Sequence, residues 1–157
     1  MQRVVHPVCV LCLLAGACLG QSAPTDIRDV SLCLLQESVR QGEHETVRVS
    51  GVFSEGLELG ILDDAACPKE STWVELELRS KRNREKLSRL LDRSRQAYVV
   101  FEGEFYGPPL PDTKLPENIR NAYHPNWGHL GCCRTKLVVH AIRDVKAAPA
   151  DPTDGGH

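Results

Sequence analysis

Four side chains near the C-terminal end of the sequence are of the types that bind transition metals: His124, His129, Cys132 and Cys133. Two imidazoles and two thiolates suit zinc or copper. Zinc sites usually separate paired cysteines by about two to four residues, so that both sulfur atoms can turn toward one ion, and an adjacent pair lacks that freedom. The pair therefore has three interpretations: two free or buried thiols, a strained vicinal disulfide, or a metal or redox site.

Aromatic side chains gather in the same part of the sequence. Residues 107–131 include Tyr123, Trp127 and His129, and Tyr106 directly precedes them. Long segments without regular structure are uncommon in compact domains and often carry function. Aromatic side chains at the mouth of a small barrel suit a sugar or a peptide, so we predict a ligand-binding surface of Tyr106, Tyr123, Trp127 and His129. The alternative is that Trp127 only fills the end of the barrel.

No arrangement in the sequence predicts catalysis. No motif places a cysteine beside a histidine as nucleophile and base. Asp63 and Asp64 belong to an expected loop, while Glu102 and Glu104 belong to an expected strand surface, where acidic side chains are ordinary. We therefore expect a protein that is not an enzyme and has no resident cofactor.

A basic stretch at residues 79–95 carries eight lysines or arginines against two acids. Leu87, Leu90 and Leu91 form one apolar face at helical spacing, which indicates a solvated helix whose aliphatic side chains pack on the domain. The stretch holds no aromatic residue, and the whole chain has a formal net charge of −2. Binding to nucleic acid is therefore not expected.

Residues 1–20 have the pattern of an export signal, in which Arg3 precedes an apolar run that ends in small residues. The run is too short and too interrupted for a membrane span, which needs about 20 apolar residues. Cleavage after Ala17 or Gly20 would release the protein, whereas the sequence before Cys18 resembles a bacterial lipoprotein signal with Cys18 as the lipidated residue. Both routes predict an exported protein, periplasmic or secreted, with membrane attachment only through Cys18.

The spacing of apolar residues predicts the elements in chain order. From residue 26 the spacing is helical, and Gly42 can end this first helix. Alternation with period two predicts five strands, and the basic stretch adds a second helix between strands three and four. The expected strands cover residues 46–53, 57–61, 73–78, 97–106 and 135–142.

The first and fourth expected strands carry Gly51 and Gly103 at points where a long strand would bend. This order of strands and helix, with these bends, is that of the OB-fold, a five-stranded Greek-key barrel. An immunoglobulin-like sandwich would need about seven strands. We therefore predict a mainly β fold with helices, an OB-like barrel over residues 27–145. Residues 21–26 would form a tether and residues 146–157 a disordered tail.

Several short motifs add to this expectation. They are Val47-x-Val49-x-Gly51, Gly56-Leu57-Glu58, Cys67-Pro68, Trp73-Val74-Glu75, Gly103-x-Phe105 and Gly128-His129-Leu130-Gly131. Together they resemble a group of small exported bacterial proteins that have OB-like barrels and no established activity. The resemblance covers roughly residues 27–145; it implies the fold and export and transfers no catalytic residue.

Four cysteines lie in the expected exported domain, where an oxidising environment favours disulfides. In a simple strand meander, the entry to the first strand and the connection between strands two and three share one end of the barrel. The connection between strands four and five would lie at the other end. We therefore predict a disulfide between Cys33 and Cys67, with Cys132 and Cys133 at the opposite end. Because neighbouring side chains on a strand point to opposite faces, one of the latter pair can enter the core while the other faces the long segment.

These expectations favour an exported, monomeric, non-enzymatic binding or structural module of the cell envelope. It would bind an envelope protein, a glycan or a small ligand through the face of strands two and three and residues 107–131. The alternative is a thiol-dependent metal-binding or redox protein that uses His129, Cys132 and Cys133. Zinc or copper would be its metal, and His124 would be a further ligand.

Overall fold

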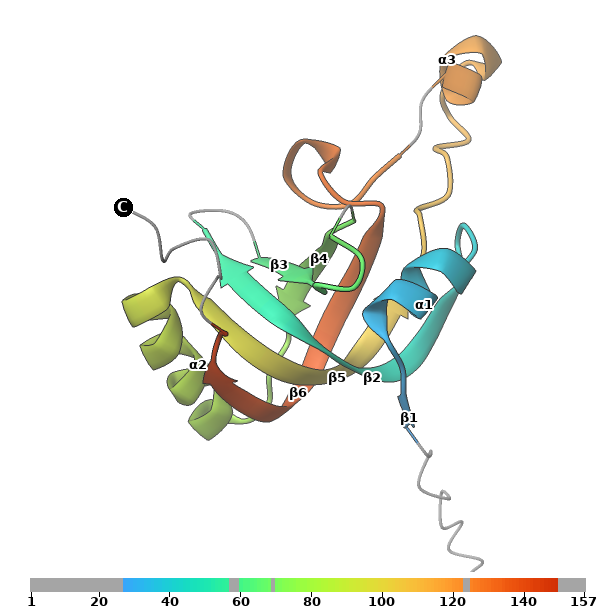
Figure 1. Ribbon diagram of the computed structural model, residues 1–157. Coiled ribbons are helices and arrows are strands. Elements are labelled where there is room, and N and C mark those ends of the chain that lie inside the picture. Colours follow the sequence, from blue (N-terminus) through green and yellow to red (C-terminus); the bar gives the residue numbers. More distant parts are fainter. Residues whose placement is uncertain (1–26, 57–59, 69, 123–124, 150–157) are drawn as a thin grey trace, which may run out of the picture.

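The computed structural model describes residues 27–56, 60–68, 70–122 and 125–149 (Figure 1). Within these ranges the protein is mainly β, with a six-stranded mixed sheet and three α-helices. None of the helices in the described part is long and apolar enough to cross a membrane. The strands are β1 (Arg28–Asp29), β2 (His44–Glu55), β3 (Gly60–Asp63), β4 (Thr72–Leu76), β5 (Gln96–Tyr106) and β6 (Thr135–Ala147). The helices are α1 (Leu32–Ser38), α2 (Lys81–Ser94) and α3 (Glu117–Ala122).

Five of the strands close into a ring. The strand order is β1-β2-β3-β4-β6-β5, and β5 also pairs with β2, which completes the circuit. A side chain at Gly103 would collide with the carbonyl oxygen of Val138, and one at Gly51 would collide with that of Asp63. The two glycines that the sequence marked as bends therefore allow neighbouring strands to approach closely.

The core lies inside the ring and is covered by α1 and α2. Its largest fully buried side chains come from both helices and from four strands of the ring: Leu32, Leu35, Phe53, Leu62, Leu87, Phe101, Phe105 and Leu137. Phe53 and Phe101 meet edge to face, with ring centroids 5.5 Å apart. Leu87 and Leu91 are the buried face of α2, so the basic stretch is an amphipathic helix on the ring, as predicted.

The first predicted helix is shorter than expected. It begins only at Leu32, because Arg28 and Asp29 form β1, which pairs with β2 in parallel. The backbone N–H of Val30 then donates to the carbonyl oxygen of Arg48 at 2.9 Å. This pairing along β2 satisfies backbone groups that a longer helix would have used, so the extended conformation is retained.

The last strand is longer than expected. β6 continues to Ala147, two residues beyond the predicted end of the domain at residue 145, because Ala97 on β5 lies opposite Ala147. The first part of the predicted tail is therefore strand, and residues 150–157 lie outside the described ranges. The predicted signal and tether, residues 1–26, also lie outside them, as do residues 57–59 at the start of the second predicted strand.

The segments that lead into β4 and β6 lie at the same end of the ring. These two strands are parallel, with Thr72 opposite Thr135, and the two threonine hydroxyl oxygens are 2.9 Å apart. Parallel neighbours begin on the same side of a sheet. The prediction that Cys132 and Cys133 occupy the end opposite Cys67 is therefore wrong, because a simple meander does not include the parallel pairing.

Candidate functional site

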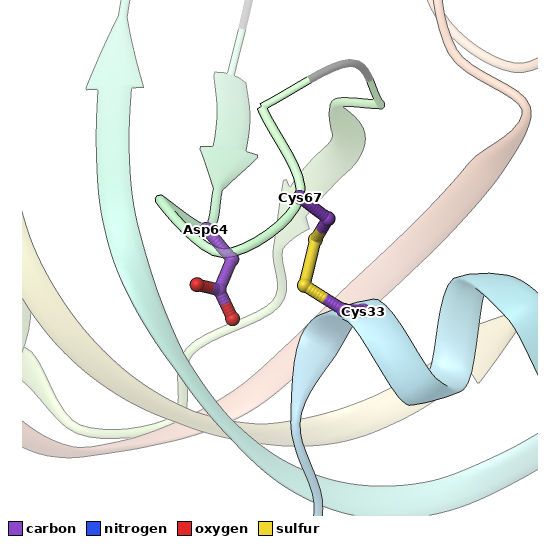
Figure 2. A group of neighbouring side chains, drawn as sticks. All are labelled: Cys33, Asp64 and Cys67. Carbon is purple, nitrogen blue, oxygen red and sulfur yellow. A yellow bond between two sulfur atoms is a disulfide. The ribbon is translucent and has the colours of Figure 1, made fainter.

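A disulfide between Cys33 and Cys67 joins α1 to the connection between β3 and β4 (Figure 2). The two Cα atoms are 5.6 Å apart, within the usual disulfide range of about 4.4–6.8 Å, and the predicted pairing is confirmed. Asp64 lies beside the pair, and these are the only three ligand-type residues in the described ranges whose ligand atoms gather within 4.8 Å of one another. Since both sulfur atoms are bonded to each other, they cannot serve as thiolate ligands while the disulfide is intact.

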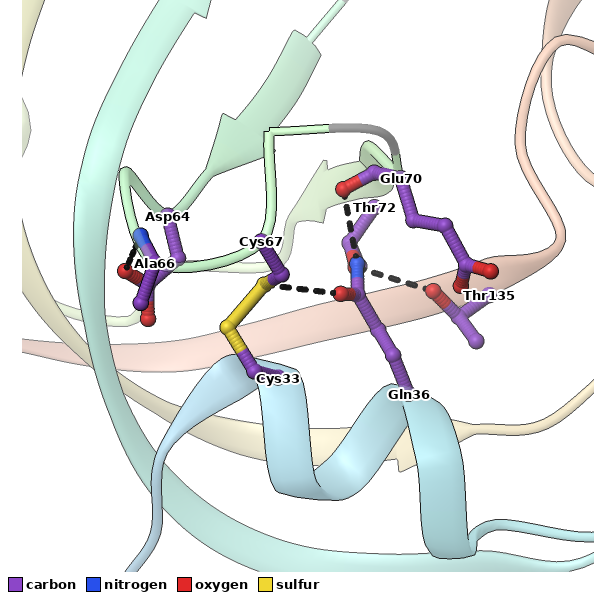
Figure 3. The surroundings of a disulfide bond; sticks show 8 residues. All are labelled: Cys33, Gln36, Asp64, Ala66, Cys67, Glu70, Thr72 and Thr135. Carbon is purple, nitrogen blue, oxygen red and sulfur yellow. Dashed lines mark hydrogen bonds between the residues drawn. A yellow bond between two sulfur atoms is a disulfide. The ribbon is translucent and has the colours of Figure 1, made fainter.

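Gln36 on α1 supports the disulfide from inside (Figure 3). Its side chain is buried, and its Nε2 donates to the carbonyl oxygen of Glu70 and to the hydroxyl of Thr72, both at 3.0 Å. Its Oε1 lies 3.3 Å from the sulfur of Cys67. Sequence reasoning missed Gln36; the available signal was its place one turn after Cys33, on the buried face of the helix.

Two hollows flank α1 at this end of the ring. The larger, of about 790 Å³, is lined by residues 37–41, Pro108, Pro125, Asn126 and Arg134. The smaller, of about 330 Å³, is lined by Gln36, Glu37, Ala66, Pro68, Glu70 and the disulfide. Glu37 lines both, and we call the two hollows together the α1 cleft.

The α1 cleft carries charges of both signs. Arg134 lies 3.8 Å from Glu70, and the two side chains are 53% and 43% exposed, so this ion pair is weak. Arg40 is exposed, and its guanidinium has no acidic partner within the described ranges. Two solvent-facing guanidinium groups in one cleft are suited to bind carboxylate or phosphate oxygens.

Asn126 and Arg134 line the larger hollow and are the two ends of a turn, residues 126–134, which we call the 126–134 turn. The backbone N–H of Trp127 donates to the carbonyl oxygen of Cys133 at 2.7 Å, and the N–H of Cys133 donates back at 3.2 Å. Between these residues Gly128, Leu130 and Gly131 all have positive φ. Gly128 lies against a tryptophan ring on β4, where a side chain would not fit. The turn is therefore held at its base and tightly folded at its tip.

Two of the predicted aromatic residues, Tyr106 and Trp127, are in contact and join the turn to β5. The rings of Tyr106 and Trp127 meet edge to face with centroids 6.2 Å apart, and Nζ of Lys136 lies 4.2 Å from the centroid of Trp127. The indole N–H of Trp127 donates to the carbonyl oxygen of Gly107 at 2.8 Å. Tyr106 donates its hydroxyl proton to the carboxylate of Glu104, which raises the pKa of Tyr106. These contacts hold the turn against β5 and β6.

The described members of the predicted binding surface, Tyr106, Trp127 and His129, are not among the residues that line the α1 cleft. Tyr106 and Trp127 are the sequence neighbours of lining residues on either side, and His129 lies in the exposed 3₁₀ turn His129–Gly131. Tyr123 and His124 lie outside the described residues, as does Cys18. The structure thus brings two of the four predicted aromatic or imidazole side chains into contact.

Cys132 and Cys133 occupy two different environments although they are adjacent. Cys133 is 1% exposed and Cys132 is exposed, which agrees with the expected alternation. Their sulfur atoms are 2.7 Å apart. Burial, with a smaller contribution from contact with Cys132, raises the pKa of Cys133 to about 12. Among the described residues, the ligand atoms of His129 and the two cysteines do not all lie within 4.8 Å of one another, and the fourth predicted ligand, His124, lies outside the described ranges.

Among the described residues, the most buried acid belongs to a separate cluster on the ring. Glu102 is 4% exposed; one carboxylate oxygen accepts a hydrogen bond from Nε of Arg48 at 2.7 Å, and the other lies 2.5 Å from Arg143. The hydrogen bonds from Arg143 and Arg48 lower the pKa of Glu102. This carboxylate is therefore held as an anion between two cations, which is a structural role and not that of a general acid.

Comparison of the chain with protein-family models, with curated proteins and with solved structures finds no match. What the site does must therefore be inferred from its own residues and their geometry.

Proposed function

We propose that this chain is an exported, non-enzymatic binding module of the cell envelope, built on an OB-like barrel, and that it binds an anionic ligand in the α1 cleft. The strand order supports the OB-like part of the proposal. Five strands in a ring with α2 between β4 and β5 agree with the order of strands in that Greek-key barrel.

Export is supported by two independent features. The pattern of residues 1–20 is that of an export signal, and the Cys33–Cys67 disulfide is of the kind that persists in oxidising compartments. The protein would act in the periplasm or outside the cell as a monomer. A lipid on Cys18 would be its only attachment to the membrane.

The observation that carries the binding proposal is the pair of arginines in the larger hollow. Arg40 has no acidic partner within the described ranges, and Arg134 shares only a weak pair with Glu70. The side-chain amides of Gln41 and Asn126 line the same hollow; their nitrogen atoms donate to the carbonyl oxygens of Pro109 and Gly131, and their oxygen atoms can accept from a ligand hydroxyl. This combination favours a ligand that carries both hydroxyls and a carboxylate, which is the chemistry of an acidic glycan.

A titration with a defined acidic sugar tests this proposal. Isotope-labelled protein is titrated with a galacturonic acid oligomer and, separately, with a neutral galactose oligomer of the same length, and backbone NMR shifts are followed. We expect shifts in residues 37–41 and 125–134 with the acidic oligomer only. Arg40→Ala and Arg134→Ala should each weaken binding at least tenfold, since a charge-assisted hydrogen bond contributes roughly 1.5–3 kcal/mol.

The matched control is Arg82→Ala. Arg82 is an exposed arginine on α2, away from α1, so its loss changes the net charge equally without altering the cleft (Figure 1). Equal weakening by Arg82→Ala would mean that the acidic oligomer responds only to surface charge and would contradict the proposal. No binding by either oligomer would favour a structural role in the envelope.

A second candidate function is thiol-dependent metal binding by His129, Cys132 and Cys133, with His124 as a further ligand. One observation favours it, the approach of the two sulfur atoms to 2.7 Å. Soft sulfur ligands together with imidazole suit zinc or copper. Metal analysis of protein purified without chelators is the test, and stoichiometric metal that is lost in Cys132→Ser would contradict a binding-only role.

A further inference from the structure

The two free cysteines of the described chain are placed for chemistry that neither could perform alone. Cys132 is open to solvent, and Cys133 lies directly behind it with its sulfur 2.7 Å away. The bridge between Trp127 and Cys133 fixes the backbone of the buried member. When a reagent from solvent reacts with Cys132, the sulfur of Cys133 is therefore already next to the modified sulfur.

A bond between these sulfur atoms would need only a small movement but would be strained. A disulfide bond is about 2.05 Å long, so the sulfur atoms have to approach by less than an ångström. Adjacent Cα atoms are about 3.8 Å apart across a trans peptide, which is less than the usual disulfide range of about 4.4–6.8 Å. Strained and exposed disulfides are reduced readily, so such a bond would open as well as close.

We propose that Cys132 and Cys133 form a thiol–disulfide exchange site whose substrate is a small-molecule disulfide. Cys132 is the entry residue because it is exposed, and Cys133 is the resolving residue because it is shielded from solvent and touches Cys132. The site is independent of the Cys33–Cys67 disulfide, which has no free thiol.

The exchange proceeds in two balanced steps. The thiolate of Cys132 attacks one sulfur of the small disulfide, the S–S bond of that molecule breaks, and one small thiolate leaves and takes up a proton. Cys133 then attacks the sulfur of Cys132, the bond between Cys132 and the small molecule breaks, and the departing sulfur takes up the proton of Cys133 and leaves as the second small thiol. Two electrons pass from the cysteine pair to the small disulfide, which ends as two thiols, while the pair ends as a vicinal disulfide.

Oxidation of the pair would also change the wall of the α1 cleft. Asn126 and Arg134 line the larger hollow, and the cysteines lie between them in the 126–134 turn. A consequence for ligand affinity rests on the proposed function, whereas the exchange reaction itself does not. The backbone of Trp127 is hydrogen-bonded to that of Cys133, and the ring of Trp73 lies against Gly128. Tryptophan fluorescence therefore reports a change in the conformation of the 126–134 turn.

Glutathione redox buffers test the exchange reaction directly. The full-length protein, as processed by the cell, is equilibrated at decreasing ratios of glutathione to glutathione disulfide, quenched with acid, alkylated and digested with trypsin. The peptide of residues 121–134 contains Cys132 and Cys133 and no other cysteine. We expect it to change from a doubly alkylated form to one that resists alkylation and lacks two hydrogen atoms, together with a change in tryptophan fluorescence.

Two variants separate the steps. Cys133→Ser should retain one glutathione on Cys132, because no resolving thiol remains, and Cys132→Ser should react with glutathione disulfide at least tenfold more slowly. The proposal is overturned if the wild-type peptide stays doubly alkylated in the most oxidising buffer, or if it ends as a stable glutathione adduct. Exchange without any effect of oxidation on binding of the galacturonic acid oligomer would leave the reaction in place and remove only its link to the cleft.

Discussion

The Cys33–Cys67 and Cys132–Cys133 pairs lie at the same end of the ring and are built in opposite ways. The first joins residues 34 positions apart, from a helix and a loop whose Cα atoms are 5.6 Å apart. The second consists of neighbours in a tight turn, where one thiol is exposed and the other is buried. The pair that is distant in sequence forms a structural crosslink, whereas the adjacent pair keeps two free thiols although its sulfur atoms are only 2.7 Å apart.

The difference extends to the surroundings of each pair. The first is supported by Gln36, whose buried amide also bonds Glu70 and Thr72 and so links α1 to the start of β4. The second lies in a turn whose base is held by backbone hydrogen bonds between Trp127 and Cys133 and by contacts of the Trp127 side chain, while the tip of the turn faces solvent. A buried support favours a permanent bond, whereas a pair beside an exposed tip can accommodate two redox states.

The largest expected effect is the difference in the reactivity of Cys133 between the native and the unfolded protein. Its pKa is raised from 9.0 to about 12 by burial, by the contact with Cys132 and by the charge of Asp63. At pH 8 its thiolate fraction is therefore roughly a thousandfold below that of a thiol with pKa 9. We expect iodoacetamide to modify Cys133 in the reduced native protein about a thousandfold more slowly than in urea, as measured on the peptide of residues 121–134.

The rate of alkylation of Cys133 in the native protein should increase with pH. Because only the thiolate reacts, the native rate at Cys133 should rise about tenfold per pH unit and level off near pH 12. Rapid native alkylation at pH 8 would show that Cys133 is not shielded, and the contrast between the two pairs would then be weaker than the structure indicates.

The next effect is on stability. Replacing both Cys33 and Cys67 by alanine should lower the free energy of unfolding by about 3–4 kcal/mol, because the open loop regains chain entropy when the protein unfolds. The matched control, Cys132→Ala with Cys133→Ala, removes no crosslink from the dithiol form and should cost about 1 kcal/mol. Urea denaturation measures the free energy of unfolding of both double variants. Equal losses of stability would show that the Cys33–Cys67 disulfide stabilises the protein no more than the free pair does.

The ion pairs of Glu102 are a non-covalent contribution to stability that can be compared with the disulfide. Glu102→Gln should lower the free energy of unfolding by about 2 kcal/mol at pH 7, less than for a fully buried ion pair because Arg48 and Arg143 are partly exposed. The pKa of Glu102 is lowered from 4.5, so its contribution is complete above that value and is lost as the pH falls below it. The gap between wild type and variant should therefore narrow below pH 4.5.

The control for this variant is Glu77→Gln. Glu77 is 66% exposed and lies 3.9 Å from His140, so its removal should change stability by less than about 0.5 kcal/mol. Denaturation curves at several pH values measure both variants. A constant gap down to pH 3 would mean that the stabilisation by Glu102 does not depend on its charge.

The smallest expected effect concerns the tip of the 126–134 turn. Leu130 has a φ of 55° and a side chain that is 93% exposed, so it pays for a left-handed conformation without gaining buried surface. Leu130→Gly should raise the free energy of unfolding by about 0.5–1 kcal/mol. Leu110→Gly is the control, because Leu110 is also exposed but has negative φ and should lose stability. A loss in both variants would mean that Leu130 makes a contact in solution.

Local patterns predicted much of the fold. Alternation identified the strands of the ring, helical spacing identified the buried face of α2, and Gly51 and Gly103 marked the close approaches between strands. These features follow from period and residue size, which short stretches of sequence carry. The parallel pairing of β4 and β6 joins residues more than sixty positions apart, such as Thr72 and Thr135, and no local period encodes it.

The candidate site was less accessible from sequence. The Cys33–Cys67 disulfide could be predicted because both cysteines precede strands that were assigned to one end. The α1 cleft could not be predicted, since Arg40 and Arg134 lie in segments without a regular hydrophobic period. Only the folding of the strands into a ring places both arginines at one hollow. Gln36 was missed, and the expectation that Glu102 lies on a strand surface was wrong, since it is buried between Arg48 and Arg143. A buried polar side chain has the same local pattern as an exposed one until its partners are known.

The parallel entry of β4 and β6 also makes this end of the protein a scaffold for loop exchange. The two segments that lead into these strands lie side by side, and neither takes part in the pairing of β2 with β5 that closes the ring. Exposed residues of either segment can therefore be varied or added to while the strand register and Cys67 are kept. A library with variation in both segments would present its diversity on one continuous surface, with the sulfur crosslink at its margin.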